Sequence, residues 1–181
     1  AGNTRFTVAG CGKSGDWTRL PDVAAALQGA AWTLQGDACY VSYAHVADYA
    51  LVYANTSSGV GVFLVSVAET GVRLTNHKAD DFKQRLSTLH FDGVSATRLI
   101  GVDAQAQKLA LNIALVALAG EQVGGSQRIF ALTVEYLKTR YQFGQPIGRF
   151  QALKHMAADL LVELESATSA ARHAALVIDS G

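Results

Sequence analysis

The chain has 181 residues, 50% of them hydrophobic, so it can bury the core of one large domain or of two small ones. Its 15 Lys and Arg residues balance its 15 Asp and Glu residues, leaving a formal charge of zero. Such a chain has no net field to attract nucleic acid or an anionic membrane, so we expect no nucleic-acid partner and only locally bound anions.

Short β-branched or aromatic runs, separated by Gly, Asp, Asn and Ser, fill the first hundred residues. These features predict strands at residues 5–9, 30–36, 38–44, 49–55, 60–67, 72–76 and 85–91. One helical turn is expected at "PDVAAAL", residues 21–27, and turns at "SSG" and "DG". We therefore expect a small antiparallel β-barrel or sandwich over residues 1–101.

Two cysteines, Cys11 and Cys39, are the whole thiol content, and their spacing fits no metal site. Without a secretory signal ahead of them they indicate a reducing compartment, so we expect free thiols and a cytoplasmic location. "GCGKS", residues 10–14, resembles half of a phosphate-cradling loop. The earlier glycine of that motif is replaced by Thr7, so nucleotide hydrolysis is not favoured.

Helical periodicity begins after Gly101, with Asp103 as the expected N-cap. It predicts one helix over about 104–141 and a second one from Phe150 to about Ala174. The apolar run "LALNIALVALAG" at 109–120 is shorter than the ~20 residues that span a bilayer, so a buried helix is expected rather than a membrane span.

A short Gly- and Pro-containing connection joins the two expected helices. It predicts an antiparallel helical hairpin over residues 102–181, which cannot bury both apolar faces alone. We therefore interpret this region as part of an incomplete four-helix bundle, completed by further sequence or by another subunit. The predicted fold class is α+β.

The connection itself, "YLKTRYQFGQPIGRFQ" at 136–151, concentrates charge and aromatic rings. Arg140, Gln142 and Phe143 could hold a phosphate and pack on a flat ring. A polar helix end followed by a turn explains the same residues, because cations are common at helix C-termini. Chemistry alone leaves both interpretations open.

The longer stretch "YLKTRYQFGQPIGRFQALKHMAADL" at 136–160 closely resembles the acyl-CoA dehydrogenase signature. The resemblance extends upstream through "AGEQVGGSQR" and into the strand region around Trp32, Leu34 and Gly36. It therefore covers nearly the whole chain. It implies the middle β domain and the first two helices of the C-terminal domain of such an enzyme, with the chain as a fragment.

What the resemblance implies chemically is FAD-dependent α,β-dehydrogenation of an acyl-CoA thioester to 2-enoyl-CoA. A carboxylate removes the α-proton, the β-hydrogen passes to FAD as a hydride, and an electron-transfer flavoprotein accepts the electrons. The family also implies a homo-oligomer, either a dimer or a tetramer, or a heteromeric partner subunit. Oxidase and monooxygenase relatives on the same fold stay open.

Seven residues inherit cofactor-binding roles from the resemblance. "CYVS" places an aromatic residue and a hydroxyl against the isoalloxazine ring, while the connection between the helices meets the FAD of a neighbouring subunit. The expected cofactor-binding residues are Tyr40, Val41, Ser42, Arg140, Gln142, Phe143 and Gln151.

The expected departures from the family concern the catalytic base. Ala114 occupies one of the two positions at which family members carry a glutamate, and Leu115 stands where an arginine near CoA is frequent. The chain therefore contains no identified catalytic residue, and we expect it to be inactive alone. A non-catalytic FAD-holding subunit and a purely structural helix-pairing module are the alternatives.

Overall fold

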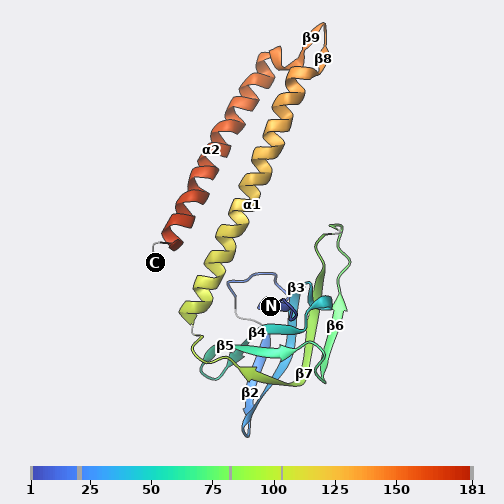
Figure 1. The fold of residues 1–181 in the computed structure, drawn as a ribbon, viewed down its shortest axis with the longest axis vertical. Coiled ribbons are helices and arrows are strands. Elements are labelled where there is room, and N and C mark those ends of the chain that lie inside the picture. Colours follow the sequence, from blue (N-terminus) through green and yellow to red (C-terminus); the bar gives the residue numbers. More distant parts are fainter. Residues whose placement is uncertain (1, 20–21, 82, 103, 180–181) are drawn as a thin grey trace. The chain divides into compact units, whose positions relative to one another are not determined.

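The computed structural model describes residues 2–19, 22–81, 83–102 and 104–179. It contains a mixed sheet followed by two long helices (Figure 1). The strands are β1 (Phe6–Ala9), β2 (Val23–Gln28), β3 (Ala31–Ser42), β4 (Tyr49–Thr56), β5 (Gly59–Ser66), β6 (Val72–Asn76), β7 (Leu86–Arg98), β8 (Tyr141–Gln142) and β9 (Gln145–Pro146). The helices are α1 (Ala104–Thr139) and α2 (Gln151–Asp179), with short 3₁₀ turns η1 (Ala44–Val46) and η2 (Ile147–Arg149).

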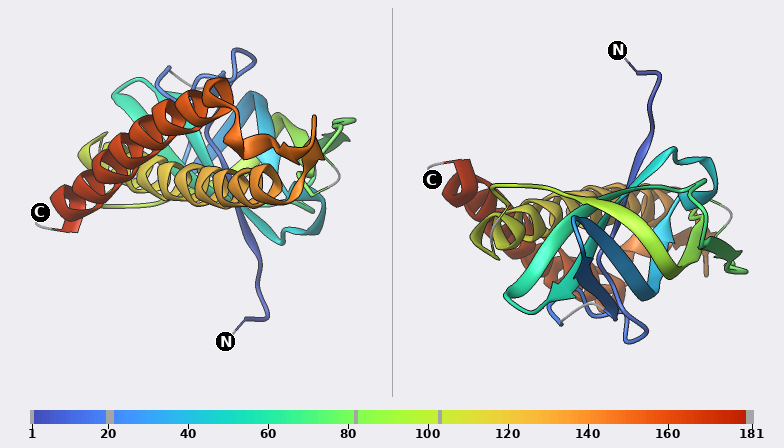
Figure 2. Two further views of the ribbon diagram at one scale, coloured as in Figure 1. Left: turned by 90° about the horizontal axis from the view of Figure 1, so that it is seen from above. Right: turned by 90° about the horizontal axis from the view of Figure 1, so that it is seen from below.

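The chain divides into two compact units, Ala1–Gln107 and Lys108–Gly181, and each is described by itself. In the first unit, β4, β2, β3, β7 and β5 pair in that order, and β5 pairs back onto β4. The ring is therefore closed, which removes the free edges of an open sheet. β1 adds to β4 in parallel, and β6 adds to β7. Figure 2 shows the strong twist of these strands.

Side chains that alternate along each strand fill the interior of this barrel. On β4, Ala50, Val52 and Ala54 are buried while the residues between them are half-buried. Phe63 is fully buried and packs against Trp32, with ring centroids 5.3 Å apart. The small antiparallel barrel that the sequence predicts is thus confirmed, although β1 and β2 pair with β4 in parallel.

Three of the predictions for this unit were wrong. Residues 23–28 form strand β2 instead of a helical turn, because pairing with β3 along the whole segment overrides the helix propensity of its alanines. The predicted strands at 30–36 and 38–44 are one continuous, bulged strand, β3. The "DG" turn likewise lies inside β7, where Gly93 has a φ of 63° beside a register shift.

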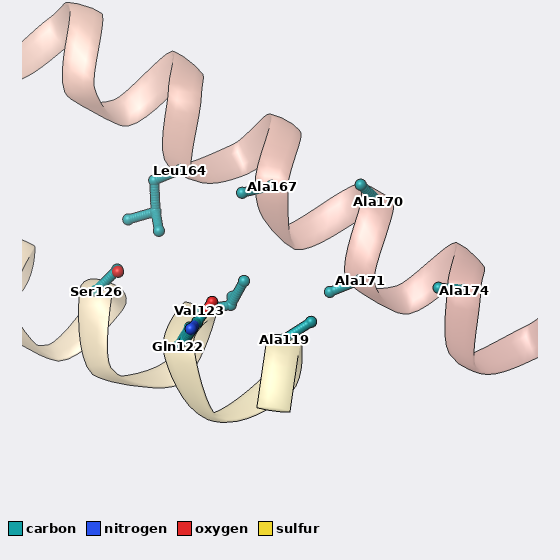
Figure 3. Close-up of a pocket in the computed structure, with 9 residues that line it drawn as sticks. All are labelled: Ala119, Gln122, Val123, Ser126, Leu164, Ala167, Ala170, Ala171 and Ala174. Atoms are coloured by element: carbon teal, nitrogen blue, oxygen red, sulfur yellow. The ribbon is translucent and has the colours of Figure 1, made fainter. Parts of the chain in front are cut away.

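The second unit is a helical hairpin in which α1 and α2 run antiparallel, joined by β8, β9 and η2 (Figure 1). Gln127 on α1 donates to the Thr168 hydroxyl on α2 at 3.2 Å, and Thr168 is buried. Further along, a hollow of about 480 Å³ separates the helices. Small side chains line it, including Ala119, Ala167 and Ala171 (Figure 3). The predicted helical hairpin is confirmed, and its expected N-cap, residue 103, lies outside the described residues.

Apolar side chains of α1 are exposed in this chain, among them Leu109, Ile113 and Leu118. The expectation of a buried helix is therefore not met by the contacts of α1 within the chain. The apolar run at 109–120 belongs to a 36-residue helix, so its short length does not by itself argue against a membrane span. Among the described residues, this one helix is long and apolar enough to cross a membrane, with a mean hydropathy of 1.3 over its most apolar part. Length and composition alone do not separate a membrane span from a helix of a larger bundle.

Candidate functional site

In the first unit, a β-bulge near the end of β3 turns Tyr40 toward solvent. Ala38 pairs with Leu89, and Val41 pairs with Ser87. Between these two pairs β3 contains two residues and β7 contains one, which is the pattern of a β-bulge. Tyr40 accommodates the extra residue with a φ of 55°, in the left-handed region. The bulge therefore places an aromatic ring on the surface at the cost of local backbone strain.

The residues that follow the bulge alternate between surface and core. Val41 is buried, whereas Tyr40 is 41% exposed and Ser42 is exposed. The Ser42 carbonyl accepts a hydrogen bond from the Thr7 hydroxyl at 2.6 Å, which ties the end of β3 to β1. An exposed aromatic ring and a hydroxyl thus stand two residues apart on one face, while Val41 acts as their anchor in the core and not as a surface contact.

Two further residues that the sequence analysis did not single out surround Tyr40. His77, which follows β6, stacks on the Tyr40 ring with centroids 5.6 Å apart and planes 22° apart. On the loop after β1, a Cβ atom at Gly15 would lie 3.7 Å from the Tyr40 ring. No spacing rule links residues 15, 40 and 77, so only the folded chain reveals this neighbourhood.

The "GCGKS" loop belongs to the same neighbourhood but has no phosphate-loop geometry. The Lys13 amide donates to the Asp22 carboxylate at 2.8 Å, and no helix follows the loop among the residues described up to β2. The Cys11 carbonyl accepts from the Cys39 amide at 2.8 Å. Both thiols are free and buried, and burial raises the pKa of the Cys11 thiol. The interpretation against nucleotide hydrolysis and the expectation of free thiols therefore agree with the structure.

A chain of polar contacts crosses the sheet close by. The His90 Nδ1 and Asp37 Oδ1 atoms are 2.7 Å apart, and Lys13 Nζ lies 3.5 Å from the other oxygen of Asp37. On its far side, His90 Nε2 is 3.2 Å from the Thr75 hydroxyl. The hydrogen bond with His90, followed by the charges of His90 and Lys13, holds the pKa of Asp37 below its usual value despite partial burial. This arrangement fastens β3 to β7 and to the loop after β1.

In the second unit, Arg140 directly follows the last turn of α1. Its amide donates to the Tyr136 carbonyl at 2.9 Å, and its carbonyl accepts from the Ile147 amide at 2.8 Å. Its side chain is exposed. Both backbone groups of Arg140 are therefore held, while its guanidinium is presented to solvent beside a helix C-terminus.

The next residues form a two-residue hairpin between β8 and β9. Phe143 and Gly144 occupy its tip with φ values of 51° and 75°, the positive values that such tight hairpin turns require. Phe143 is 89% exposed and meets Phe150 edge to face, with centroids 6.2 Å apart. Gln142 is exposed on β8, and Gln151 is exposed at the first turn of α2.

Strained, exposed aromatic residues mark both places. Among the described residues, the non-glycine residues with positive φ are Tyr40, Tyr43 and Phe143. Such conformations cost about 1–3 kcal/mol each and concentrate at ligand-contacting sites. Two of these three residues are ones that the sequence analysis expects to contact FAD, although φ played no part in that expectation.

These surfaces have the chemistry that a flavin nucleotide requires. Tyr40 and Phe143 offer exposed rings for flat heterocycles. Ser42 offers a hydroxyl for a ring heteroatom, and Arg140 offers a guanidinium for a phosphate. The residues present therefore fit the chemistry of FAD, with an exposed ring and a hydroxyl at Tyr40 and Ser42 and a guanidinium at Arg140.

Comparisons with known proteins identify the family of this chain. Residues 103–181 match the family model for the acyl-CoA dehydrogenase C-terminal domain. The acyl-CoA dehydrogenase FadE27 of Mycobacterium tuberculosis is 34% identical over 91% of this chain and 43% of its own length. The chain belongs to the acyl-CoA dehydrogenase family.

Solved acyl-CoA dehydrogenase structures share the whole of this fold. The Tcur3481–Tcur3483 steroid acyl-CoA dehydrogenase variant is 32% identical, with a TM-score of 0.85 over 99% of this chain and 49% of that one. The ChsE4–ChsE5 complex of Mycobacterium tuberculosis is 28% identical, with a TM-score of 0.80 over 97% of this chain and 48% of that one. The chain thus spans about half the length of the solved chains that it matches.

Proposed function

We propose that this chain is the flavin-contacting part of an FAD-dependent dehydrogenase that converts an acyl-CoA thioester to 2-enoyl-CoA. The observation that carries the proposal is the coincidence of strained, exposed aromatic residues with the family's flavin positions, at Tyr40 and Phe143. When bound, FAD would accept the β-hydrogen of the acyl chain as a hydride. An electron-transfer flavoprotein is the proposed electron acceptor.

Tyr40 and Ser42 would orient the isoalloxazine ring. The Tyr40 ring packs on it and excludes water from one of its edges, and the Ser42 hydroxyl donates a hydrogen bond to its N5 or O4 region. Val41 is buried between them and holds both side chains at a fixed spacing. Orientation of this kind lowers the entropic part of the barrier to hydride transfer.

Arg140, Gln142, Phe143 and Gln151 would hold the FAD of a neighbouring subunit. The guanidinium binds phosphate oxygens, the two amides donate to polar atoms of the nucleotide, and Phe143 packs on its flat ring. A site of this kind makes cofactor binding depend on assembly, so the proposal includes a dimer or tetramer.

The catalytic base is proposed to lie elsewhere in the protein. Ala114, aligned with one of the family's glutamate positions, has a methyl side chain that cannot accept the α-proton. A second candidate follows from the same residue: a subunit that holds FAD for a partner carrying the base. The similarity to the two-component ChsE4–ChsE5 complex favours it.

Replacement of Arg140 by Ala tests the cofactor assignment. We expect the full-length natural protein to lose FAD about 10- to 100-fold more readily, since a hydrogen bond to a charged group contributes about 1.5–3 kcal/mol. The melting temperature of the FAD-free protein should change little, because the Arg140 side chain is exposed. Absorbance of the flavin per mole of purified protein gives the result.

Lys138→Ala is the matched control. Lys138 is an exposed cation in the last turn of α1, two residues before Arg140, and it pairs with Glu135 at 2.8 Å. It should therefore leave flavin content unchanged. Equal flavin content in Arg140→Ala and the unmodified protein would refute the assignment. Absence of any flavin band in the natural protein and its complexes would favour the structural helix-pairing module instead.

The two candidates differ in what Ala114→Glu should do. If the protein holds FAD for a partner that carries the base, removing that partner abolishes dye-linked acyl-CoA oxidation, and the new carboxylate can restore part of it. If the protein carries its own base elsewhere, it oxidises acyl-CoA without a partner, and Ala114→Glu brings no gain. The present chain purified alone should bind FAD weakly and show no turnover in either case.

A further inference from the structure

His77 is fixed in place at two points close to Tyr40. Its amide donates to the Leu86 carbonyl at 2.9 Å, which closes the loop between β6 and β7. Its ring Nε2 lies 2.8 Å from the hydroxyl of Thr88, a buried residue of β7. The imidazole is therefore held against the sheet by its hydrogen bond with the buried residue Thr88.

The face of this anchored imidazole carries the Tyr40 ring. The near-parallel planes, 22° apart, and the centroid distance of 5.6 Å are those of an offset stack. The backbone at Gly15 lies beside the same ring, since a Cβ added there would make an ordinary van der Waals contact with it at 3.7 Å. The imidazole thus restricts the orientation of a phenol ring that is 41% exposed.

We propose that His77 is a positioning residue for Tyr40 and so sets the angle at which the phenol ring meets the isoalloxazine. This inference rests on the proposed function, which makes Tyr40 a flavin contact. Thr88 on β7 holds the His77 ring by a hydrogen bond, and the His77 ring in turn stacks on Tyr40. Without the imidazole, the Tyr40 ring rotates among its side-chain rotamers, and its contact with the flavin is averaged away.

The first measurement needs no flavin. In protein with isotope-labelled tyrosine rings, the His77 ring current shifts the Tyr40 ring protons, and His77→Leu should remove that shift. His77→Phe keeps an aromatic face and should restore most of the shift. Thr88→Val releases the imidazole from its anchor and should give an intermediate value. Unchanged Tyr40 resonances in His77→Leu would overturn the proposal.

The second measurement compares His77→Leu with Tyr40→Leu in the full-length, flavin-loaded natural protein. Both should weaken flavin binding by about 2- to 10-fold and release part of the quenching of flavin fluorescence, as expected from loss of one aromatic contact. His77→Phe should bind flavin nearly as well as the unmodified protein. Thr75→Val is the matched control. It removes the hydroxyl that lies beside the ring of His90, a histidine that does not stack on Tyr40.

The outcomes separate the inference from the function on which it rests. If Tyr40→Leu changes the flavin signals and His77→Leu does not, His77 does not position Tyr40, while the proposed flavin contact stands. If neither variant changes them, Tyr40 is not a flavin contact, and the proposal falls with that assignment. Equal effects of Thr75→Val and His77→Leu would show a general loss of sheet stability and would also overturn the proposal.

Discussion

Replacing Tyr40 by Gly should separate stability from cofactor binding. Gly relieves about 1–3 kcal/mol of strain at the left-handed backbone of Tyr40. Against this stand about 0.5–1 kcal/mol of added unfolded-chain entropy and about 0.5–1.5 kcal/mol from the lost stack on His77. The terms nearly cancel, so the free energy of unfolding should stay within about 2 kcal/mol of its original value.

Flavin binding should respond differently, because the ring that contacts the isoalloxazine is gone. We expect the dissociation constant for FAD to rise roughly tenfold, which corresponds to a loss of about 1.4 kcal/mol of binding free energy. Urea denaturation measures the first quantity and equilibrium titration of FAD the second. Tyr40→Phe keeps the ring and should preserve both values.

Tyr43→Gly is the backbone control, since Tyr43 has a φ of 53°. Its hydroxyl donates to the Lys83 carbonyl, so this variant should lose about 1 kcal/mol more stability than Tyr40→Gly. A loss above about 3 kcal/mol in Tyr40→Gly would show that the ring is a packing element of the fold. An unchanged affinity for FAD would refute its role at the cofactor.

Three other substitutions probe how the two surfaces are held. Gly36→Ala combines a φ of 122° with a clash against the carbonyl oxygen of Asp22, just before β2, so it should lower the free energy of unfolding by about 2–4 kcal/mol in thermal denaturation. Gly148→Ala would bring a Cβ within 2.8 Å of the Leu137 carbonyl oxygen, and it should displace the β8–β9 hairpin and reduce flavin retention. The pKa of Asp37 lies below its ordinary 3.8 mainly through His90, so Asp37 stabilises the fold above that pH and this stability is lost as the pH falls through the folded-state pKa. Asp37→Asn should therefore destabilise the protein by about 1 kcal/mol at pH 7, and by progressively less as the pH falls below 3.8 toward the folded-state pKa. A loss that stays constant over this acidic range would contradict the assignment.

Local sequence patterns predict much of this fold. Helical periodicity predicted α1 to within two residues of its C-terminal end at Thr139, because repeating apolar side chains and the turn residues near Gly144 act over a few positions. Strands β4, β5 and β6 were found for the same reason. β2 was not, because its alanines favour a helix in isolation, and only pairing with β3 makes them a strand.

The candidate site divides in the same way. The signature at residues 136–160 and the "CYVS" stretch are continuous segments, so the sequence by itself determined the family and named Tyr40, Ser42, Arg140 and Phe143. The bulge that exposes Tyr40, the stack on His77 and the nearness of Gly15 bring together residues far apart along the chain. Only the tertiary structure decided these features, because register and side-chain stacking depend on which strands meet, and no local propensity encodes that choice.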